Sequence, residues 1–321
     1  MSMSHNKIPV TVAEVVTLNP LIKRFRFVRR DGASLPAFSG GAHVVVEMDD
    51  HGTRRMNPYS LMSAPSDTTG YEISVRRDDV GRGGSLYLHQ HVKVGDDLVI
   101  SAPVNLFGLD LQAKKHLMLA GGIGITPFIA QMALLSAMAG RFELHYAARN
   151  PGLAAYADDL RARYGDRVQL YYDDQDQKIA LAPLLAGQPL GTHLYVCGPK
   201  GMIDWVRRTA TDMGWPQQCV HYEEFLAPPT GKPFQVELAA SQKTITVGPD
   251  QSLLEAIEAA GVDAPYLCRG GACGQCETDV VSCDGHIQHH DHWLSDEEKA
   301  TGRKIMPCVS RFEGRSLVLD R

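Results

Sequence analysis

Four cysteines near the C-terminal end of the chain have the spacing of metal ligands. Cys268, Cys273 and Cys276 follow the pattern C-x4-C-x2-C, and Cys308 stands alone after a long gap. This spacing is typical of a plant-type 2Fe–2S cluster, which four thiolates hold and which transfers single electrons. The loop around the first three cysteines is rich in glycine, and glycine reaches left-handed backbone angles without a Cβ clash. The sequence therefore predicts an iron–sulfur redox centre.

Zinc and disulfides are the alternatives for these cysteines. Structural zinc usually takes two closely spaced ligand pairs, whereas Cys308 is isolated. Disulfides need an oxidising compartment, and the N-terminal residues do not resemble a signal peptide. We therefore expect a cytoplasmic protein in which Cys197, Cys219 and Cys283 are reduced thiols.

The length and charge of the chain limit its partners. A chain of 321 residues predicts two or three domains, and no apolar run is long enough to span a membrane. The net charge is −5, but residues 234–321 hold 14 acidic and 8 basic residues. This distribution argues against nucleic acid as a partner and suits transient electrostatic docking on a basic protein. An acidic surface that only increases solubility is the alternative.

The chain predicts a multidomain α+β fold. Residues 1–110 alternate apolar and polar positions between turns, which indicates an antiparallel β-barrel or sandwich, of which we expect the barrel. Residues 111–226 alternate strands with helices, which indicates an α/β domain with a parallel sheet. The predicted strands are 10–18, 22–28, 43–48, 72–75 and 97–101, then 116–120, 142–147, 168–172 and 193–197, and the predicted helices of the second domain are 127–138, 155–164 and 202–213.

A proline- and glycine-rich segment divides the last domain from the rest. Residues 227–233 form the predicted linker, since proline and glycine interrupt both helix and sheet. Residues 234–321 then form the predicted ferredoxin domain. It contains a hairpin over 234–238 and 243–247, a helix over 252–260 and a closing strand over 317–319.

Two glycine-containing turns in the second domain predict a nicotinamide site. Gly121, Gly122, Gly124 and Thr126 follow one strand and precede a helix, and Cys197-Gly198-Pro199 does the same further on. Carboxyl ends of parallel strands are where open α/β sheets bind ligands, and a helix N-terminus suits phosphate. The first turn is not the G-x-G-x-x-G of a Rossmann unit, and packing alone can also require such glycines.

Four further residues belong to this prediction. Arg149 follows a strand at the same edge and is either a cofactor contact or a solvated charge. Cys197 is placed near the nicotinamide, or is a small buried residue. Asp173 and Asp174 end the next strand, where a carboxylate accepts ribose hydroxyls and repels a 2′-phosphate. The sequence thus favours NADH over NADPH, unless the two acids form only a turn.

A flavin is needed between these two centres, because NADH donates a hydride whereas the cluster accepts one electron at a time. Residues 54–61 are one candidate: Tyr59 packs on the isoalloxazine, Ser60 bonds its polar edge and an arginine faces the phosphate. The other candidate is the turn at residues 81–85, with Gly83, Gly84 and Ser85 ahead of a short helix over 86–91. Each segment alone is also compatible with a surface turn.

Together these motifs resemble the phthalate dioxygenase reductase family, which are ferredoxin-NADP reductase-like flavoproteins with a plant-type ferredoxin of β-grasp fold at the C-terminus. The resemblance covers nearly the whole chain. It rests on Tyr59-Ser60-Leu61, residues 81–85, residues 121–127, Cys197-Gly198-Pro199, His221-Tyr222-Glu223-Glu224-Phe225 and the cysteine loop. It implies a barrel that binds FMN, a domain that binds NADH, and a cluster that supplies a Rieske-type oxygenase acting on aromatic acids and related small molecules. It further implies that Phe225 covers the flavin near the hydride-transfer face; packing of the domain junction is the other role for this residue.

One position departs from the family pattern. The flavin motif of the family is R-x-Y-S, but Asn57 occupies the arginine position and Arg55 lies four residues before the tyrosine. Either a bulge brings Arg55 or Arg54 inward, or Asn57 performs part of the role. We expect FMN instead of FAD, because no additional adenine-binding segment is evident.

Four histidines crowd the segment between the third and fourth cluster cysteines. His286, His289, His290 and His292 are predicted to lie in a long loop, where they either bind a metal or form an ordinary polar surface. Trp293 is predicted to be a packed or interface aromatic, and Ser295 to cap a helix together with Glu298.

The sequence thus predicts an NADH-dependent oxidoreductase in which electrons pass from NADH through FMN to the 2Fe–2S cluster and then to an oxygenase. No Ser-His-Asp or paired-carboxylate signature is apparent. The alternatives are an iron–sulfur redox sensor or binding module, and a reductase for a cytochrome-type acceptor.

Overall fold

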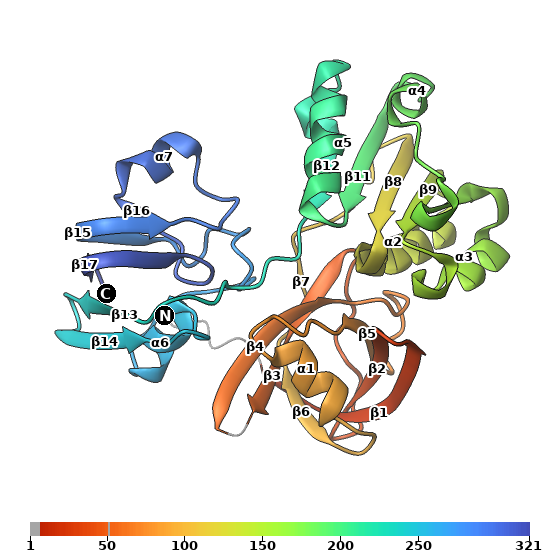
Figure 1. Cartoon of the computed structure of the whole chain (residues 1–321). Coiled ribbons are helices and arrows are strands. Elements are labelled where there is room, and N and C mark those ends of the chain that lie inside the picture. Colours follow the sequence, from red (N-terminus) through yellow and green to blue (C-terminus); the bar gives the residue numbers. More distant parts are fainter. Residues whose placement is uncertain (1–6, 51) are drawn as a thin grey trace.

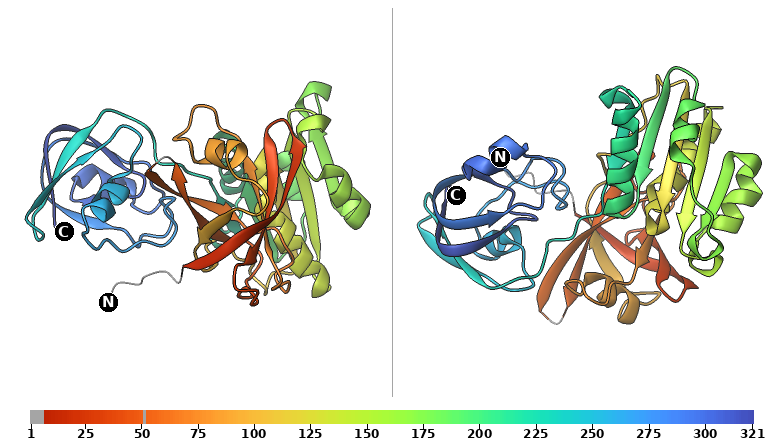
Figure 2. Two further views of the ribbon diagram at one scale, coloured as in Figure 1. Left: turned by 90° about the horizontal axis from the view of Figure 1, so that it is seen from below. Right: turned by 45° about the horizontal axis from the view of Figure 1, so that its top comes forward.

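The computed structural model describes residues 7–50 and 52–321, so residues 1–6 of the predicted 1–110 domain and His51 lie outside the described part. Three sheets form three units (Figure 1). The extended segment after β12 leads from the second unit to the third (Figures 1 and 2). The fold class predicted from the sequence is confirmed.

The first unit is a curled, antiparallel seven-stranded sheet with order β4-β3-β6-β1-β2-β5, in which β7 pairs with β3. Its elements are β1 (Ile8–Asn19), β2 (Ile22–Arg29), β3 (Ala42–Asp50), β4 (Thr53–Ser60), β5 (Tyr71–Arg76), α1 (Gly84–Gln90), β6 (Asp97–Ile100) and β7 (Val104–Asn105). Alternate residues of the strands, such as Phe25, Phe27, Val44 and Val46, fill its core. The predicted flavin motif lies on β4, a strand that the sequence reasoning did not assign.

The second unit is a parallel five-stranded sheet with order β10-β9-β8-β11-β12. Its elements are β8 (Lys115–Gly121), α2 (Thr126–Ala137), β9 (Phe142–Ala148), α3 (Ala157–Tyr164), β10 (Val168–Tyr172), α4 (Leu181–Ala186), β11 (Thr192–Cys197), α5 (Lys200–Asp212) and β12 (Val220–Glu223). The strand order reverses between β8 and β11. Ligands bind such sheets in the crevice at that reversal, and the two predicted turns follow these two strands.

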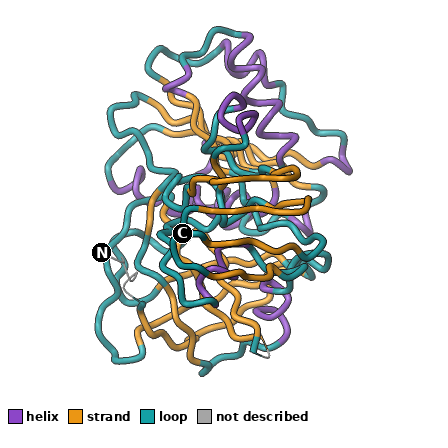
Figure 3. Tube along the Cα trace, turned by 90° about the vertical axis from the view of Figure 1, so that its left-hand side faces the viewer, coloured by secondary structure: helices purple, strands orange, loops and turns teal. Residues whose placement is uncertain are grey.

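The third unit has the order β14-β13-β17-β15-β16 and is seen from its own side in Figure 3. Its elements are β13 (Phe234–Leu238), β14 (Lys243–Val247), α6 (Leu253–Ala259), β15 (Thr278–Gln288), α7 (Asp296–Thr301), β16 (Lys304–Ile305) and β17 (Arg311–Leu319). Capping boxes begin both helices, through Ser252 with Glu255 and, as predicted, through Ser295 with Glu298.

The predicted long loop after the third cluster cysteine is wrong in its first part. Residues Thr278–Gln288 form β15, which pairs with β17, so that His286 lies on a strand. The closing strand β17 is correspondingly longer than predicted. Both strands are mostly exposed in their middle parts, so the apolar alternation that marks a strand in a sequence is absent there.

In the described part of the chain, no helix is long and apolar enough to cross a membrane.

Candidate functional site

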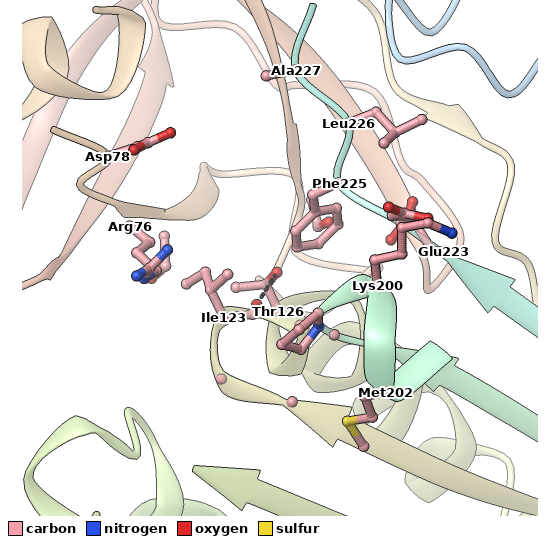
Figure 4. A pocket seen from close by; sticks show the side chains of 18 of the residues that line it. Arg76, Asp78, Ile123, Thr126, Lys200, Met202, Glu223, Phe225, Leu226 and Ala227 are labelled. Carbon is pink, nitrogen blue, oxygen red and sulfur yellow. Dashed lines mark hydrogen bonds between the residues drawn. The ribbon is translucent and has the colours of Figure 1, made fainter. Parts of the chain in front are cut away.

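A cavity of about 1190 Å³ lies where the three units meet (Figure 4). It exceeds the usual range of about 300–1,000 Å³ for small-molecule pockets, so there is room for more than one ligand group. The predicted site residues that line it are Asn57, Tyr59, Ser60, Gly83, Gly84, Ser85, Gly121, Gly122, Gly124, Thr126, Arg149, Asp173, Gly198, Pro199, Phe225 and Cys268. Of the predicted set, Arg55, Cys197, Cys273, Cys276 and Cys308 lie outside this lining. Residues far apart in the sequence therefore share one cavity.

Arg55 and Asn57 both pack against the 81–85 turn. A Cβ atom added to Gly84 would lie 2.6 Å from the Asn57 amide nitrogen, and one added to Gly83 would lie 3.3 Å from the Arg55 guanidinium. Arg55 pairs with Asp50 at 2.9 Å, while its Nη1 is buried without a hydrogen-bond partner. Arg54 instead pairs with Glu47. A buried, unpartnered cationic nitrogen beside a glycine turn fits a phosphate group.

The two turns of the parallel sheet touch each other backbone to backbone. A Cβ atom on Gly124 would lie 2.2 Å from the Cys197 carbonyl oxygen, and one on Gly121 would lie 2.7 Å from Pro199. Packing thus requires these two glycines. Gly122 differs, because it has a φ of +54° and nothing within 4 Å of its Cβ position. Gly122 is therefore open to a ligand in the cavity.

Arg149 and Asp173 lie on the wall of the cavity beyond these turns. Both line it, and the backbone N–H of Asp174 donates to the Arg149 carbonyl. Lys200 and Met202 of α5 also line the cavity, as does Arg76 at the end of β5. The sequence reasoning missed these last three residues, since a single residue at an element end carries no distinctive pattern.

Glu223 was part of the resemblance but was given no role, and its environment is unusual. It ends β12 and pairs in register with Cys197 at the end of β11. Its Oε2 atom is buried without a partner, and burial raises the pKa of its carboxyl to about 8. Burial also raises the pKa of the Cys197 thiol. Burial thus favours the protonated form of the Glu223 carboxyl, which lines the cavity.

Phe225 follows two residues after Glu223 and extends into the cavity. In Figure 4 its ring lies between Arg76 and Asp78 on one side and Lys200 and Glu223 on the other. It remains 46% exposed despite its apolar ring. An exposed aromatic side chain in a ligand-sized cavity suits stacking on a planar group.

The four cluster cysteines approach each other in two pairs. The Cys268 thiol is within hydrogen-bonding reach of Cys273, and that of Cys276 is within reach of Cys308. The backbone N–H of Gly270 donates to the Cys268 sulfur at 3.4 Å. Two thiolates for each of two irons is the ligand set of a 2Fe–2S cluster. Within residues 7–50 and 52–321, no group of three or more histidine, cysteine, aspartate or glutamate side chains is placed to hold a single metal ion.

The histidine-rich segment does not gather its rings around one point. His286 lies on β15, His289 lies 3.6 Å from Asp291, and His292 pairs with Glu224 of the second unit at 3.0 Å. All seven cysteines are free thiols.

A substitution at the contact between the two turns tests their packing. Gly124→Ala places a methyl group on the Cys197 carbonyl, so we expect the free energy of unfolding to fall by about 1–3 kcal/mol and NADH binding to weaken. Thermal unfolding and NADH titration measure the two effects. Gly201→Ala is the matched control, since its Cβ position has nothing within 4 Å. Equal behaviour of the two variants would contradict the packing role.

The raised pKa of Glu223 predicts a pH dependence of stability. Between about pH 4.5 and pH 8 the unfolded chain loses this proton while the folded chain keeps it, so stability falls as the pH rises. Glu223→Gln removes that part of the decline. Urea unfolding at pH 5 and pH 8 measures it, with Asp212→Asn, an exposed acid on α5, as the control. A parallel decline in wild type and Glu223→Gln would show that Glu223 titrates normally.

Comparison with known proteins shows which family models and relatives the chain matches. Residues 100–220 match the N-terminal domain of dimethylamine monooxygenase subunit DmmA-like proteins, and residues 236–313 match the 2Fe–2S iron–sulfur cluster binding domain. The chain is 47% identical to the heme-dependent oxidative N-demethylase beta subunit of Ectopseudomonas mendocina, over 97% of this chain and 98% of that protein. It is 43% identical to the carnitine monooxygenase reductase subunit of Acinetobacter baumannii, over 100% of both chains.

A solved structure shows the same three-unit arrangement along the whole chain. Phthalate dioxygenase reductase matches with a TM-score of 0.88 and 34% identity, over 98% of each chain. That protein is described as a modular structure for electron transfer from pyridine nucleotides to a 2Fe–2S centre. The relatives show the family, and the cysteine pairs and the shared cavity agree with it: the chain belongs to the phthalate dioxygenase reductase-like family of oxygenase reductases.

Proposed function

We propose that this protein is the reductase component of an oxygenase system and transfers electrons from NADH through a flavin to its 2Fe–2S cluster and on to the oxygenase. The observation that supports the proposal most is that residues from all three units line one cavity. The β4 motif, the turns after β8 and β11, and Cys268 of the cluster loop all line it. Redox groups held by these residues would be close enough to exchange electrons.

Each group of residues then has its own role in binding a redox group. A bound flavin accepts a hydride and releases single electrons. Tyr59 and Ser60 would hold its ring system, and Phe225 would pack against the flavin, since all three line the cavity. The glycine turns around Gly122 and Gly198 would hold the pyridine nucleotide, beside the buried Glu223 carboxyl, whose protonated form burial favours. The cluster thiolates are Cys268, Cys273, Cys276 and Cys308.

The flavin that we propose is FMN. Gly83 and Gly84 let Arg55 and Asn57 approach the 81–85 turn, and the unpartnered Nη1 of Arg55 suits a terminal phosphate. Asp173 on the cavity wall supports NADH over NADPH, since a carboxylate repels a 2′-phosphate. Mass spectrometry of the released flavin distinguishes FMN from FAD.

We further propose a Rieske-type oxygenase as the partner, in keeping with the family resemblance. A heme protein is the second candidate, because the relative that is 47% identical is named as a subunit of a heme-dependent demethylase. Both acceptors take single electrons from the cluster, so the reductase chemistry is the same.

Anaerobic addition of NADH tests the electron pathway. We expect flavin absorption and then iron–sulfur absorption to bleach, and Cys308→Ser to lose the iron–sulfur absorption and reduction of cytochrome c while it still reduces ferricyanide. Cys283→Ser, an exposed thiol of the same unit, is the control and should match wild type. Bound flavin that ignores NADH would instead favour a redox sensor.

Reconstitution with purified oxygenases tests the partner. If docking is electrostatic, turnover should fall as ionic strength rises past about 0.1 M, where charges more than about 10 Å apart are screened. Rates that do not depend on salt would contradict electrostatic docking. Comparison of a Rieske-type and a heme-containing acceptor under these conditions separates the two candidates.

A further inference from the structure

Arg82 of the predicted flavin turn binds the third unit. Its Nη2 donates to both carboxylate oxygens of Glu255, at 2.7 and 2.6 Å, and its Nε donates to the Asp250 carbonyl at 2.9 Å. The Arg82 and Glu255 side chains are only 9% and 11% exposed. This pair joins residues 173 positions apart in the chain and crosses from the first unit to the third.

The segment that Arg82 contacts is fixed to the body of the third unit. Arg311 is buried and donates to the Gly248 and Gln251 carbonyls, on either side of Asp250, and to the linker carbonyls of Pro229 and Lys232. Glu255 also accepts from the Ser252 backbone N–H in the capping box of α6. Both partners of Arg82, the Asp250 carbonyl and the Glu255 carboxylate, therefore belong to a segment held by further hydrogen bonds within the third unit.

Two other contacts lie on the same side of the third unit. Tyr266, two residues before Cys268, lies in a small hollow with Glu47 and Met56 of the first unit. His292 pairs with Glu224, and both line the main cavity together with Cys268. Arg82 adds a third contact, beside the predicted flavin phosphate.

We propose that Arg82 is a positioning residue for electron transfer: its pair with Glu255 docks the ferredoxin unit so that Cys268 faces the flavin. The proposal rests on the proposed function, because it assumes a flavin at the 81–85 turn. Within this turn Gly83 and Gly84 border Arg55 and Asn57, while Arg82 directs its guanidinium donors to the ferredoxin. One short turn therefore sets the position of both redox partners.

The test compares docking and electron transfer in the flavin-loaded holoenzyme. In Arg82→Gln we expect proteolytic cleavage of the linker at residues 227–233 to accelerate, and the rate of flavin-to-cluster transfer to fall about tenfold or more, as for a buried charge pair that has lost one partner. NADH-dependent ferricyanide reduction, which needs the flavin alone, is compared in Glu255→Gln, because Glu255 lies on α6 of the third unit and does not line the flavin cavity; there it should stay within about twofold of wild type. Small-angle scattering should show a larger radius of gyration.

Matched variants keep the result interpretable. Glu255→Gln retains an acceptor for the Ser252 amide and should reproduce both effects, and the double variant should be no worse than either single variant. Arg82→Lys should restore part of the docking through its charge. Arg30→Ala is the control, since Arg30 pairs with Asp97 inside the first unit. If Arg82→Gln fails to fold, linker cleavage and flavin-to-cluster transfer in Glu255→Gln decide whether the pair positions the ferredoxin unit.

The two proposals fail in different ways. A holoenzyme whose flavin is not reduced by NADH contradicts the proposed function. A flavin that is reduced normally, with linker cleavage, scattering and cluster reduction in Arg82→Gln and Glu255→Gln equal to those of Arg30→Ala, overturns the positioning role of Arg82.

Discussion

Contact between separately folded units determines whether this molecule can carry electrons along its length. The third unit has a core of its own, and so do the first unit and the two faces of the parallel sheet. Burial of apolar surface therefore stabilises each unit but does not by itself orient the ferredoxin toward the flavin. That orientation depends on the few polar contacts that cross between units, with Arg82 and Glu255 the most buried of those that reach the ferredoxin from the first unit.

The first two units are joined in a different way. Gly40 and Gly41 press against Gln131 and the Phe107 carbonyl so closely that a Cβ atom on either glycine would clash with the backbone. The Gln131 amide donates to that same carbonyl, and Ser74 bonds Tyr156. Backbone-to-backbone packing of this kind leaves little freedom to shift. The first two units are thus closely packed against each other, whereas Arg82 reaches the ferredoxin unit through a long charged side chain.

Local signals made part of this arrangement predictable from the sequence. The glycine turns after β8 and β11, the cysteine spacing and the capping box at Ser295 are each fixed by a few neighbouring residues, and each was predicted. The burial of Glu223, the partner of Arg82 and the strand β15 depend on segments far away in the chain. A sequence pattern carries no information on which distant residue faces an arginine, so these features required the structure.

The histidine-rich segment shows how such distant contacts change an interpretation. Gly274, in the cysteine loop, has a φ of +73°, and a Cβ atom there would lie 2.2 Å from the Trp293 ring. Gly271 meets Asp291 in the same way, and the backbone N–H of His292 donates to the Gly271 carbonyl. Residues 291–293 therefore cover the loop that carries the first three cluster cysteines. Since a side chain larger than hydrogen at Gly274 would displace this cover, the loop needs glycine for contact as well as for conformation. Of the four histidines only His292 belongs to this cover, and Trp293 next to it is left 51% exposed.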